Sequence, residues 1–397
     1  MALEDVAEAE LAQVSEEPIS RVLFVVDSTF PGAGGAEAQA EKLAKAFKSK
    51  NVYLEFVSPR TLPDMSDYEL VDGTPCHRIS YPHIKYLGAA LLLIRFAWFL
   101  FKRRKDFDVV HVHITRFLAA VAVMMRPLTG LPVITKISGY FEFKGGILDP
   151  DSKNPANAFL RKTLRKIDFV QTISVQTRER LLEAGFSESQ IKYIPNGIDS
   201  KESIRTLDQL PTRDSASLNT LVFGYCGRLR EVKGVEELVD SFIDFAKKQP
   251  NQDVKLRIAG GGKLFKTLND RVIENGLEDR VELLGPVDNT LEFYKSLDVY
   301  IQPSFAEGLP NSVIEAMVCG LPVLATDIGG NRDLVDHDKE GWLFEAGDTD
   351  ALTALMQRCV DDVDSLSSMG LQGRERIVAA YEISSVTDSL LGLYRAK

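Results

Sequence analysis

The amino-acid sequence predicts an α/β protein built from two successive doubly wound parallel sheets, and three observations carry this prediction. Short apolar runs rich in β-branched residues alternate with amphipathic helical segments along most of the chain. A glycine-bearing loop follows the first strand of each half and opens into a helix or turn. A polar segment at residues 199–219, which contains Pro211, reads as a linker between the halves.

Residues 1–20 are expected to form an acidic disordered tail, because they carry six acids and no base. Residues 21–200 follow as an N-terminal Rossmann-like domain. Its expected strands cover residues 21–26, 52–57, 109–113, 133–137, 168–174 and 191–195, and its expected helices open near residue 35 and cover 87–101, 117–125 and 176–184.

Residues 201–380 are expected to form a second Rossmann-like domain. Its expected strands cover 221–227, 255–260, 281–285, 298–304 and 321–326, and its expected helices cover 235–247, 312–319 and 349–360. A C-terminal helix within residues 381–397 is expected to pack back on the N-terminal domain. Since ligands of doubly wound sheets bind beyond the carboxyl ends of the strands, the two domains are predicted to face each other across a cleft.

The charge is unevenly distributed along the 397 residues. The chain has a formal net charge of −10, 45% hydrophobic and 26% charged residues, which is typical of a soluble globular protein and argues against a nucleic-acid partner. The tail carries −6, residues 21–200 carry +7 and residues 201–397 carry −11. A basic half joined to an acidic half indicates two domains with different partners.

The four cysteines (Cys76, Cys226, Cys319 and Cys359) are far apart in sequence and do not group with the five histidines. This spacing predicts reduced thiols in the cytoplasm, with no zinc site and no disulfide framework. The apolar segment at residues 87–101 contains Arg95 and is shorter than the roughly 20 residues that a spanning helix needs. It is therefore expected to be a buried or interfacial helix.

Two glycine-bearing loops follow predicted strands. In PGAGGAE (residues 31–37), Gly34 and Gly35 would let the backbone approach an anion at a helix N-terminus, although a simple tight turn would also use them. In GRLREVKG (residues 227–234), the planar guanidinium of Arg228 and the ammonium of Lys233 suit the oxygens of a diphosphate. The alternative is that both are solvated surface side chains without a ligand.

The segment PSFAEGLPNSVIEAM (residues 303–317) places Glu307 in a loop and Glu315 on the following helix. The amides at the start of this helix would attract a phosphate. A helix carboxylate beside a phosphate site is well placed to accept hydrogen bonds from a ribose diol, and the loop carboxylate could reach a sugar hydroxyl. Two glutamates at this spacing say little by themselves. Together with the flanking Gly308 and Pro310 they are a specific signal for a binding site.

The order G-G-x-E, G-R-L-x₃-K-G and E-G-L-P-N-x₃-E resembles the retaining GT-B glycosyltransferases, the family 4-like group that includes sucrose-phosphate synthase and bacterial mannosyltransferases. The resemblance covers roughly residues 21–397. It implies that the domain of residues 21–200 binds the acceptor and that the domain of residues 201–380 binds the nucleotide-sugar donor. It also implies transfer of a sugar from a UDP- or GDP-linked donor to a glycan or lipid-linked glycan, with retention of configuration, in bacterial polysaccharide or glycolipid biosynthesis. The alternatives are a UDP-sugar 2-epimerase of the same architecture and a non-catalytic nucleotide-sugar-binding protein.

The resemblance also implies roles for single residues. Arg228 and Lys233 would neutralise the leaving diphosphate, Glu307 would contact the transferred sugar and Glu315 would bind the ribose. No metal and no cofactor are expected, because the two cations take the place of a metal. The remaining donor-binding candidates are Gly34, Gly35, Gly308, Leu309, Asn311 and Ser312.

The chain departs from the family pattern after the strand VITKI. Many members carry a histidine where this chain has Ser138, which can donate a hydrogen bond but does not ionise near pH 7. Ser138 and His113 are the acceptor-side candidates.

The region from Arg78 to Lys105 carries seven bases and no acid around the apolar helix. This combination favours contact with an anionic membrane surface, although a helix packed on the sheet with a solvated basic tail would show the same pattern. A second basic group follows at Arg161, Lys162, Arg165 and Lys166. The sequence therefore predicts a cytoplasmic protein that associates peripherally with the inner face of the membrane and takes a lipid-linked acceptor.

Overall fold

The computed structural model describes residues 20–32, 34–210 and 220–396 and divides the chain into two compact units. Unit 1 contains the residues up to Gly197 together with Ile383–Lys397, and unit 2 contains Ile198–Glu382. The predicted tail lies outside the described residues except for Ser20, which opens the first strand.

Unit 1 contains an eight-stranded sheet in the order β3-β4-β2-β1-β5-β6-β7-β8. All neighbouring strands are parallel except β3 and β4, which are antiparallel. The strands are β1 (Ser20–Val26), β2 (Val52–Pro59), β3 (Tyr68–Val71), β4 (Thr74–Ile79), β5 (Val109–His113), β6 (Val133–Lys136), β7 (Phe169–Thr172) and β8 (Ile191–Tyr193).

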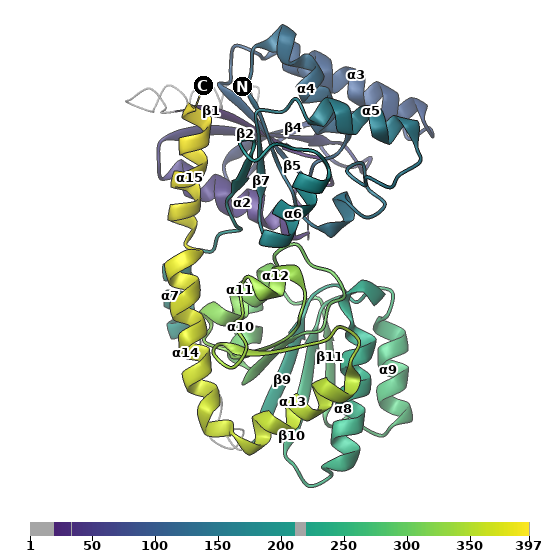
Figure 1. Cartoon of the computed structure of the whole chain (residues 1–397), viewed down its shortest axis with the longest axis vertical. Coiled ribbons are helices and arrows are strands. Elements are labelled where there is room, and N and C mark those ends of the chain that lie inside the picture. Colours follow the sequence, from purple (N-terminus) through teal and green to yellow (C-terminus); the bar gives the residue numbers. More distant parts are fainter. Residues whose placement is uncertain (1–19, 33, 211–219, 397) are drawn as a thin grey trace. The chain divides into compact units, whose positions relative to one another are not determined.

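Helices cover both faces of this sheet (Figure 1). Leu23 and Val25 of β1 face the core formed with α3, α4, α5 and α6, whereas Val22 and Phe24 face the core formed with α2 and α15. This alternation explains why the strand is apolar at nearly every position. The helices of unit 1 are α2 (Gly35–Lys48), α3 (Leu87–Lys102), α4 (Phe117–Thr129), α5 (Pro155–Leu164), α6 (Val175–Glu183) and α15 (Ile383–Arg395), with the 3₁₀ turn η1 (Tyr140–Glu142).

Unit 2 contains a six-stranded parallel sheet in the order β11-β10-β9-β12-β13-β14. Its strands are β9 (Leu221–Cys226), β10 (Val254–Ala259), β11 (Val281–Gly285), β12 (Val299–Gln302), β13 (Val323–Thr326) and β14 (Gly341–Phe344). Its helices are α7 (Ser200–Gln209), α8 (Val235–Lys248), α9 (Phe265–Glu274), α10 (Thr290–Lys295), α11 (Asn311–Val318), α12 (Gly329–Arg332), α13 (Thr349–Asp361) and α14 (Val363–Ala380), with the 3₁₀ turn η3 (Glu231–Lys233).

Each sheet reverses its direction of winding once. In unit 1 the reversal lies between β1 and β5, and in unit 2 it lies between β9 and β12. The loops that leave the carboxyl ends of such neighbouring strands diverge to opposite faces, so a crevice for ligands opens between them. The two doubly wound sheets confirm the predicted fold class and mark the places where binding residues belong.

Three local expectations were wrong or incomplete. Residues 200–209 of the expected linker form α7, which Asp199 caps by accepting the backbone N–H of Glu202 at 2.9 Å; residues 211–219 lie outside the described residues. The hairpin of β3 and β4 was not anticipated, although both residues of its Asp72-Gly73 turn have positive φ, as such two-residue turns require. The helices α5, α9, α10, α12 and α14 and the strand β14 were also missed.

The apolar segment at residues 87–101 is helical, as expected. Among the residues that the structure describes, none of the helices has the length and apolar character required to cross a bilayer.

The last helix, α15, is fastened to unit 1 by apolar contacts. Leu390 is fully buried in the core that contains Phe24 and Phe47, and the hydroxyl of Tyr394 lies 2.8 Å from Nδ1 of His111. We expect Leu390→Ala to destabilise unit 1 by about 2–5 kcal/mol, because it removes buried methyl groups and leaves a cavity. Hydrogen exchange of the β1 amides measures this free energy of opening.

The control is Ser389→Ala on the same helix, since the Ser389 hydroxyl is exposed and bonds only to the Ser385 carbonyl in the described structure. We expect a change within about 0.5 kcal/mol for this variant. Equal protection of β1 in both variants would contradict the packing of α15 described above.

Candidate functional site

Two loops meet at the reversal point of the unit 2 sheet. The loop after β9 carries Arg228 and ends in η3 with Lys233, and the loop after β12 carries Glu307 and leads into α11. The backbone N–H of Phe305 donates to the carbonyl of Val232 at 2.9 Å, which ties the two loops together. The sequence-predicted Lys233 and Glu307, 74 positions apart, are thereby brought into direct contact.

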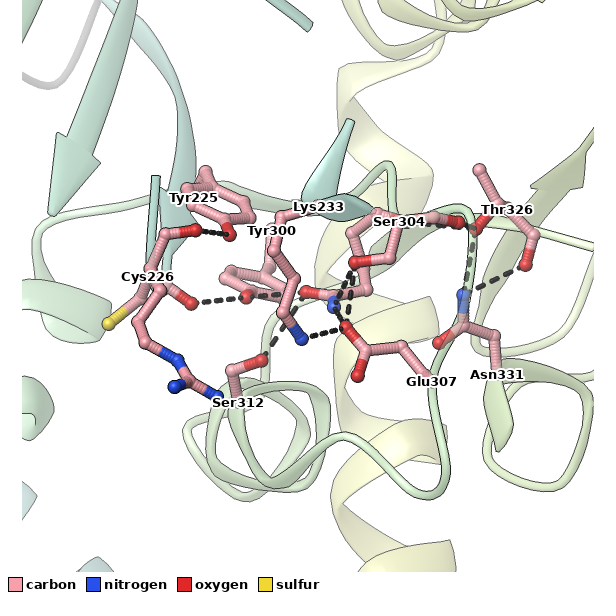
Figure 2. Close-up of polar contacts among 11 residues, drawn as sticks. Tyr225, Cys226, Lys233, Tyr300, Ser304, Glu307, Ser312, Thr326 and Asn331 are labelled. Atoms are coloured by element: carbon pink, nitrogen blue, oxygen red, sulfur yellow. Dashed lines mark hydrogen bonds and ion pairs between the residues drawn. The ribbon is translucent and has the colours of Figure 1, made fainter. Parts of the chain in front are cut away.

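One carboxylate oxygen is the centre of this contact. Oε1 of Glu307 accepts hydrogen bonds from Nζ of Lys233 at 2.6 Å, Nε2 of Gln302 at 2.7 Å and Oγ of Ser304 at 2.7 Å (Figure 2). The side chains of Glu307 and Lys233 are 10% and 22% exposed. A charged pair that is this sheltered is held in one geometry, yet the ammonium group has further N–H donors for a ligand.

A second layer of hydrogen bonds holds Gln302, the last residue of β12. Its Oε1 accepts from the hydroxyls of Tyr300 at 2.9 Å and Ser312 at 3.3 Å. The Ser304 carbonyl accepts from Oγ1 of Thr326 at 2.6 Å, and Asn331 donates to the Thr326 carbonyl at 2.9 Å (Figure 2). The loop carrying Glu307 is therefore fixed from β12, α11 and β13.

The other residues of unit 2 that were predicted to bind the sugar donor lie on the same two loops and on α11, outside the central contact at Oε1 of Glu307. Arg228 is exposed, forms no ion pair with any acidic side chain in the described parts of the chain, and accepts a weak bond from Tyr225 through its carbonyl at 3.3 Å. Gly308 and Leu309 are buried in the loop, and Asn311 opens α11 next to Ser312. An exposed guanidinium and a sheltered ammonium on the same short loop suit an anion with several oxygens.

Glu315 lies on α11 and contacts a different partner from Glu307. Its Oε2 accepts a hydrogen bond from the hydroxyl of Tyr294 at 3.3 Å. Burial raises the pKa of Tyr294 well above its usual value, so the phenol stays protonated and remains a donor. The structure thus places the two glutamates in separate hydrogen-bonding environments within unit 2.

In unit 1 the glycine-bearing loop leads from β1 into α2. Gly34 precedes the helix, and a Cβ on it would lie 2.0 Å from Oε2 of Glu37, so the carboxylate packs directly against the glycine. Glu37 also accepts a hydrogen bond from the Ser28 hydroxyl. Gly35 is the first residue of α2.

The acceptor-side candidates of unit 1 follow β5 and β6. His113 ends β5, is fully buried against the rings of Phe24 and His111, and has a pKa well below its usual value because burial disfavours the cation. The backbone N–H of Ser138 donates to Oε2 of Glu142 at 2.6 Å. The Ser138 hydroxyl is buried without a hydrogen-bond partner among the described residues.

The expected basic surface from Arg78 to Lys105 requires a correction. Arg78 is only 5% exposed because its guanidinium pairs with Glu69 and donates to the Phe30 carbonyl at 2.9 Å. Arg103 is held by Glu55 and Asp106. The bases that remain exposed are Lys85, Arg95, Lys102 and Lys105.

Sequence reasoning missed the residues that position the candidates. Gln302 and Ser304 in unit 2 and Glu142 in unit 1 were not singled out. Gln302 carried a usable signal, because it is the one polar side chain with hydrogen-bonding capacity at the carboxyl end of the apolar strand VYIQ. Glu142 carried only a weak signal: it accepts the backbone N–H groups of Ser138 and Gly139, four and three residues before it, and that of Thr115, 27 residues before it.

Comparisons with known proteins agree on both halves of the chain. Residues 212–376 match the family described as "Glycosyl transferases group 1", and residues 33–202 match "Glycosyltransferase Family 4". The chain is 26% identical over 295 residues to the N-acetyl-alpha-D-glucosaminyl L-malate synthase of Bacillus anthracis, covering 74% of this chain and 75% of that protein. It is 25% identical over 338 residues to the UDP-Gal:alpha-D-GlcNAc-diphosphoundecaprenol alpha-1,3-galactosyltransferase of Escherichia coli, covering 81% and 82%.

Solved structures share the fold. Sucrose-phosphate synthase of Thermosynechococcus elongatus superposes with a TM-score of 0.78 at 21% identity, covering 95% of this chain and 98% of that one. HepE of Anabaena in complex with UDP-glucose gives a TM-score of 0.75 at 20% identity, covering 95% and 100%.

The turn between Lys233 and α8 depends on Gly234. Its φ is +64°, and a Cβ there would lie 2.0 Å from the Pro303 carbonyl oxygen. We expect Gly234→Ala to destabilise unit 2 by clearly more than the 1–2 kcal/mol that a left-handed alanine costs, because the loops after β9 and β12 must also separate. Fluorescence of the buried Trp342 during urea unfolding, in a Trp98→Phe background, reports on unit 2.

Gly276→Ala is the matched control, since Gly276 has φ +63° and a Cβ there would meet nothing within 4 Å. Equal losses of stability in the two variants would show that the close approach of Pro303 does not constrain this loop.

Proposed function

The chain belongs to the GT-B glycosyltransferases of the group 1 and family 4 type, and from this premise we propose that it transfers a sugar from a UDP- or GDP-linked donor to a glycan or lipid-linked glycan. The contact between Lys233 and Glu307 at the reversal point of the unit 2 sheet is the observation that carries this proposal. The named relatives support the substrate classes: one uses UDP-Gal with a diphosphoundecaprenol-linked acceptor, and HepE binds UDP-glucose.

In this proposal, unit 2 holds the donor. The remaining N–H donors of Lys233 and the fork of Arg228 bind the diphosphate, together with the backbone amides at the start of α11. Glu307, fixed through Oε1, offers its other oxygen to a hydroxyl of the transferred sugar, beside Gly308, Leu309 and Asn311. Glu315 accepts hydrogen bonds from the ribose, and Gly34 and Gly35 of unit 1 line the phosphates or the acceptor.

The proposed reaction retains the anomeric configuration. The bond between the anomeric carbon and the diphosphate oxygen breaks, and negative charge develops on the diphosphate, where preorganised cations stabilise it. The acceptor hydroxyl attacks from the same face and gives its proton to the departing phosphate oxygen. Arg228 and Lys233 supply the positive charge, so the proposal assigns the transfer no metal and no cofactor.

The functional test concerns these two cations. We expect Lys233→Ala or Arg228→Ala to lower turnover by about 10²–10³-fold, because each removes charge stabilisation at the leaving group. Glu315→Ala should chiefly weaken nucleotide binding. Release of UDP or GDP from sugar nucleotides, with circular dichroism as the check on folding, provides the measurement.

Lys266→Ala serves as the charge-matched control, because the Lys266 side chain is 90% exposed on α9. Near-normal turnover in both the Lys233 and the Arg228 variants would sink the assignment of the leaving-group site.

We also propose that α3 of unit 1 rests on an anionic membrane surface. Leu87, Ile94 and Trp98 form an apolar stripe along this helix and are 53%, 63% and 56% exposed. The ammonium of Lys102 lies 5.3 Å from the centre of the Trp98 ring. An exposed aromatic and aliphatic stripe beside basic side chains suits the interface between lipid headgroups and acyl chains.

We expect the wild-type protein to co-sediment with vesicles that contain phosphatidylglycerol, and to do so less at high salt. The variant Ile94→Asp/Trp98→Asp should lose this binding, because charges replace the side chains that would enter the interface. A Lys201→Gln/Lys266→Gln variant, which removes two exposed charges from unit 2, should bind like the wild type. Absence of wild-type binding refutes the membrane contact.

A further inference from the structure

The reversal point of the unit 1 sheet carries a strained loop. Ile114, directly after β5, has φ +76°, a conformation that is a genuine outlier for a β-branched residue. It is buried, and it is followed by Thr115 and the exposed Arg116. Such strain persists only where the surroundings hold it, and it is concentrated at functional sites.

Glu142 holds this loop. Its buried carboxylate accepts the backbone N–H groups of Thr115 at 2.6 Å, Ser138 at 2.6 Å and Gly139 at 2.9 Å. The loops after β5 and β6 are therefore joined through one side chain, as the loops of unit 2 are joined through Glu307. This bonding fixes where Arg116 and Ser138 lie relative to each other.

Arg116 and Phe141 form an exposed pair above these loops. The guanidinium carbon of Arg116 lies 5.0 Å from the centre of the Phe141 ring, and that ring is 47% exposed. A Cβ on Gly139 would lie 3.1 Å from the ring, so the ring packs against bare backbone. Arg116 has no ion pair within contact distance of an acidic side chain in the part of the chain that is described, so its N–H groups remain available. Its charge nevertheless acts against the burial that raises the pKa values of Asp27 and Glu142.

A second cation lies beneath the same loops. Lys136 ends β6, is 2% exposed, and its Nζ has no hydrogen-bond partner among the described residues. A buried ammonium without a hydrogen bond is costly, and burial lowers the pKa of Lys136 to about 7, although the nearby Glu142 carboxylate acts in the opposite direction. A ligand of opposite charge at this edge of the sheet would offset that cost.

From this arrangement we propose that the loops after β5 and β6 bind a phosphate ester group of the acceptor. Arg116 donates its fork to the phosphate oxygens, Ser138 donates its hydroxyl, and the Phe141 ring packs against the sugar or alkyl part. Lys136 contributes positive charge from below. This assignment rests on the proposed glycosyl transfer and names the acceptor class; the phosphate can belong to a soluble sugar phosphate or to a lipid headgroup.

The test uses the full chain saturated with UDP or GDP, whichever it binds, so that the diphosphate site of unit 2 is filled. Calorimetric titration then compares glucose 1-phosphate with methyl glucoside, which lacks the phosphate. We expect binding of the phosphorylated probe only, and a loss of about tenfold or more in Arg116→Gln, because a charged hydrogen-bonding fork is removed. Lys136→Met should also weaken binding.

Arg21→Gln is the matched control. It removes an exposed arginine from the opposite, amino end of the same sheet, where Arg21 lies near Asp108. Because Arg116 is exposed, its variant should fold even if the variant of the buried Lys136 does not.

A second arm identifies the source of the phosphate. Vesicles of phosphatidylcholine that carry a polyprenyl phosphate are compared with vesicles of equal charge made with phosphatidylglycerol. Binding that prefers polyprenyl phosphate and requires Arg116 supports the site with a lipid-linked acceptor.

Equal binding by the wild type and Arg116→Gln in both arms, or no binding in either arm, overturns the phosphate site. Failure of the wild type to bind UDP or GDP in the first step refutes the donor assignment instead, so the two failures are distinguishable.

Discussion

The geometry of the unit 2 site depends on one carboxylate oxygen, Oε1 of Glu307. It accepts from Lys233, Gln302 and Ser304, and so joins the loops that leave the two strands flanking the reversal of the sheet (Figure 2). A sheltered ion pair of this kind is stabilising only when both charges are hydrogen-bonded, because desolvation otherwise outweighs their attraction. The arriving diphosphate would share the ammonium of Lys233 with Glu307, and a site that already holds its cation needs little reorganisation.

In unit 1 a glutamate also joins two loops, but its hydrogen-bond donors are of a different kind. The buried Glu142 accepts three backbone N–H groups from the loops after β5 and β6, whereas Glu307 accepts from three side chains. Burial raises the pKa of Glu142 to about 7 although these N–H groups favour the ionised form. In each unit, therefore, an acidic side chain at the carboxyl edge of the sheet sets the positions of neighbouring polar groups.

The sequence was sufficient for most of the strands and for Lys233 and Glu307 of the central contact, but it did not reveal β3, β4 or β14. Continuous apolar runs such as RVLFVV are required when both faces of a strand are buried, so β1 and its equivalents were found to within a residue or two. Glu307 and Lys233 stood out because their motifs concentrate glycine, proline and charge. Arg78 was misplaced because its partners, Glu69 and the Phe30 carbonyl, are brought to it by the tertiary fold. Glu142 was overlooked although two of its three partners, the N–H groups of Ser138 and Gly139, lie within four residues of it; the third, Thr115, is 27 residues away.

The most direct measurement is a double-mutant cycle on equilibrium binding of UDP and GDP, using Lys233→Met, Glu307→Gln and the double variant. The account predicts one nucleoside diphosphate bound per chain and weaker binding without Lys233. Because Glu307 and the diphosphate share the same ammonium, the effect of Lys233→Met should change in the Glu307→Gln background by more than the roughly 0.5 kcal/mol expected of independent sites. Strictly additive effects, or no binding of either nucleotide, would contradict it.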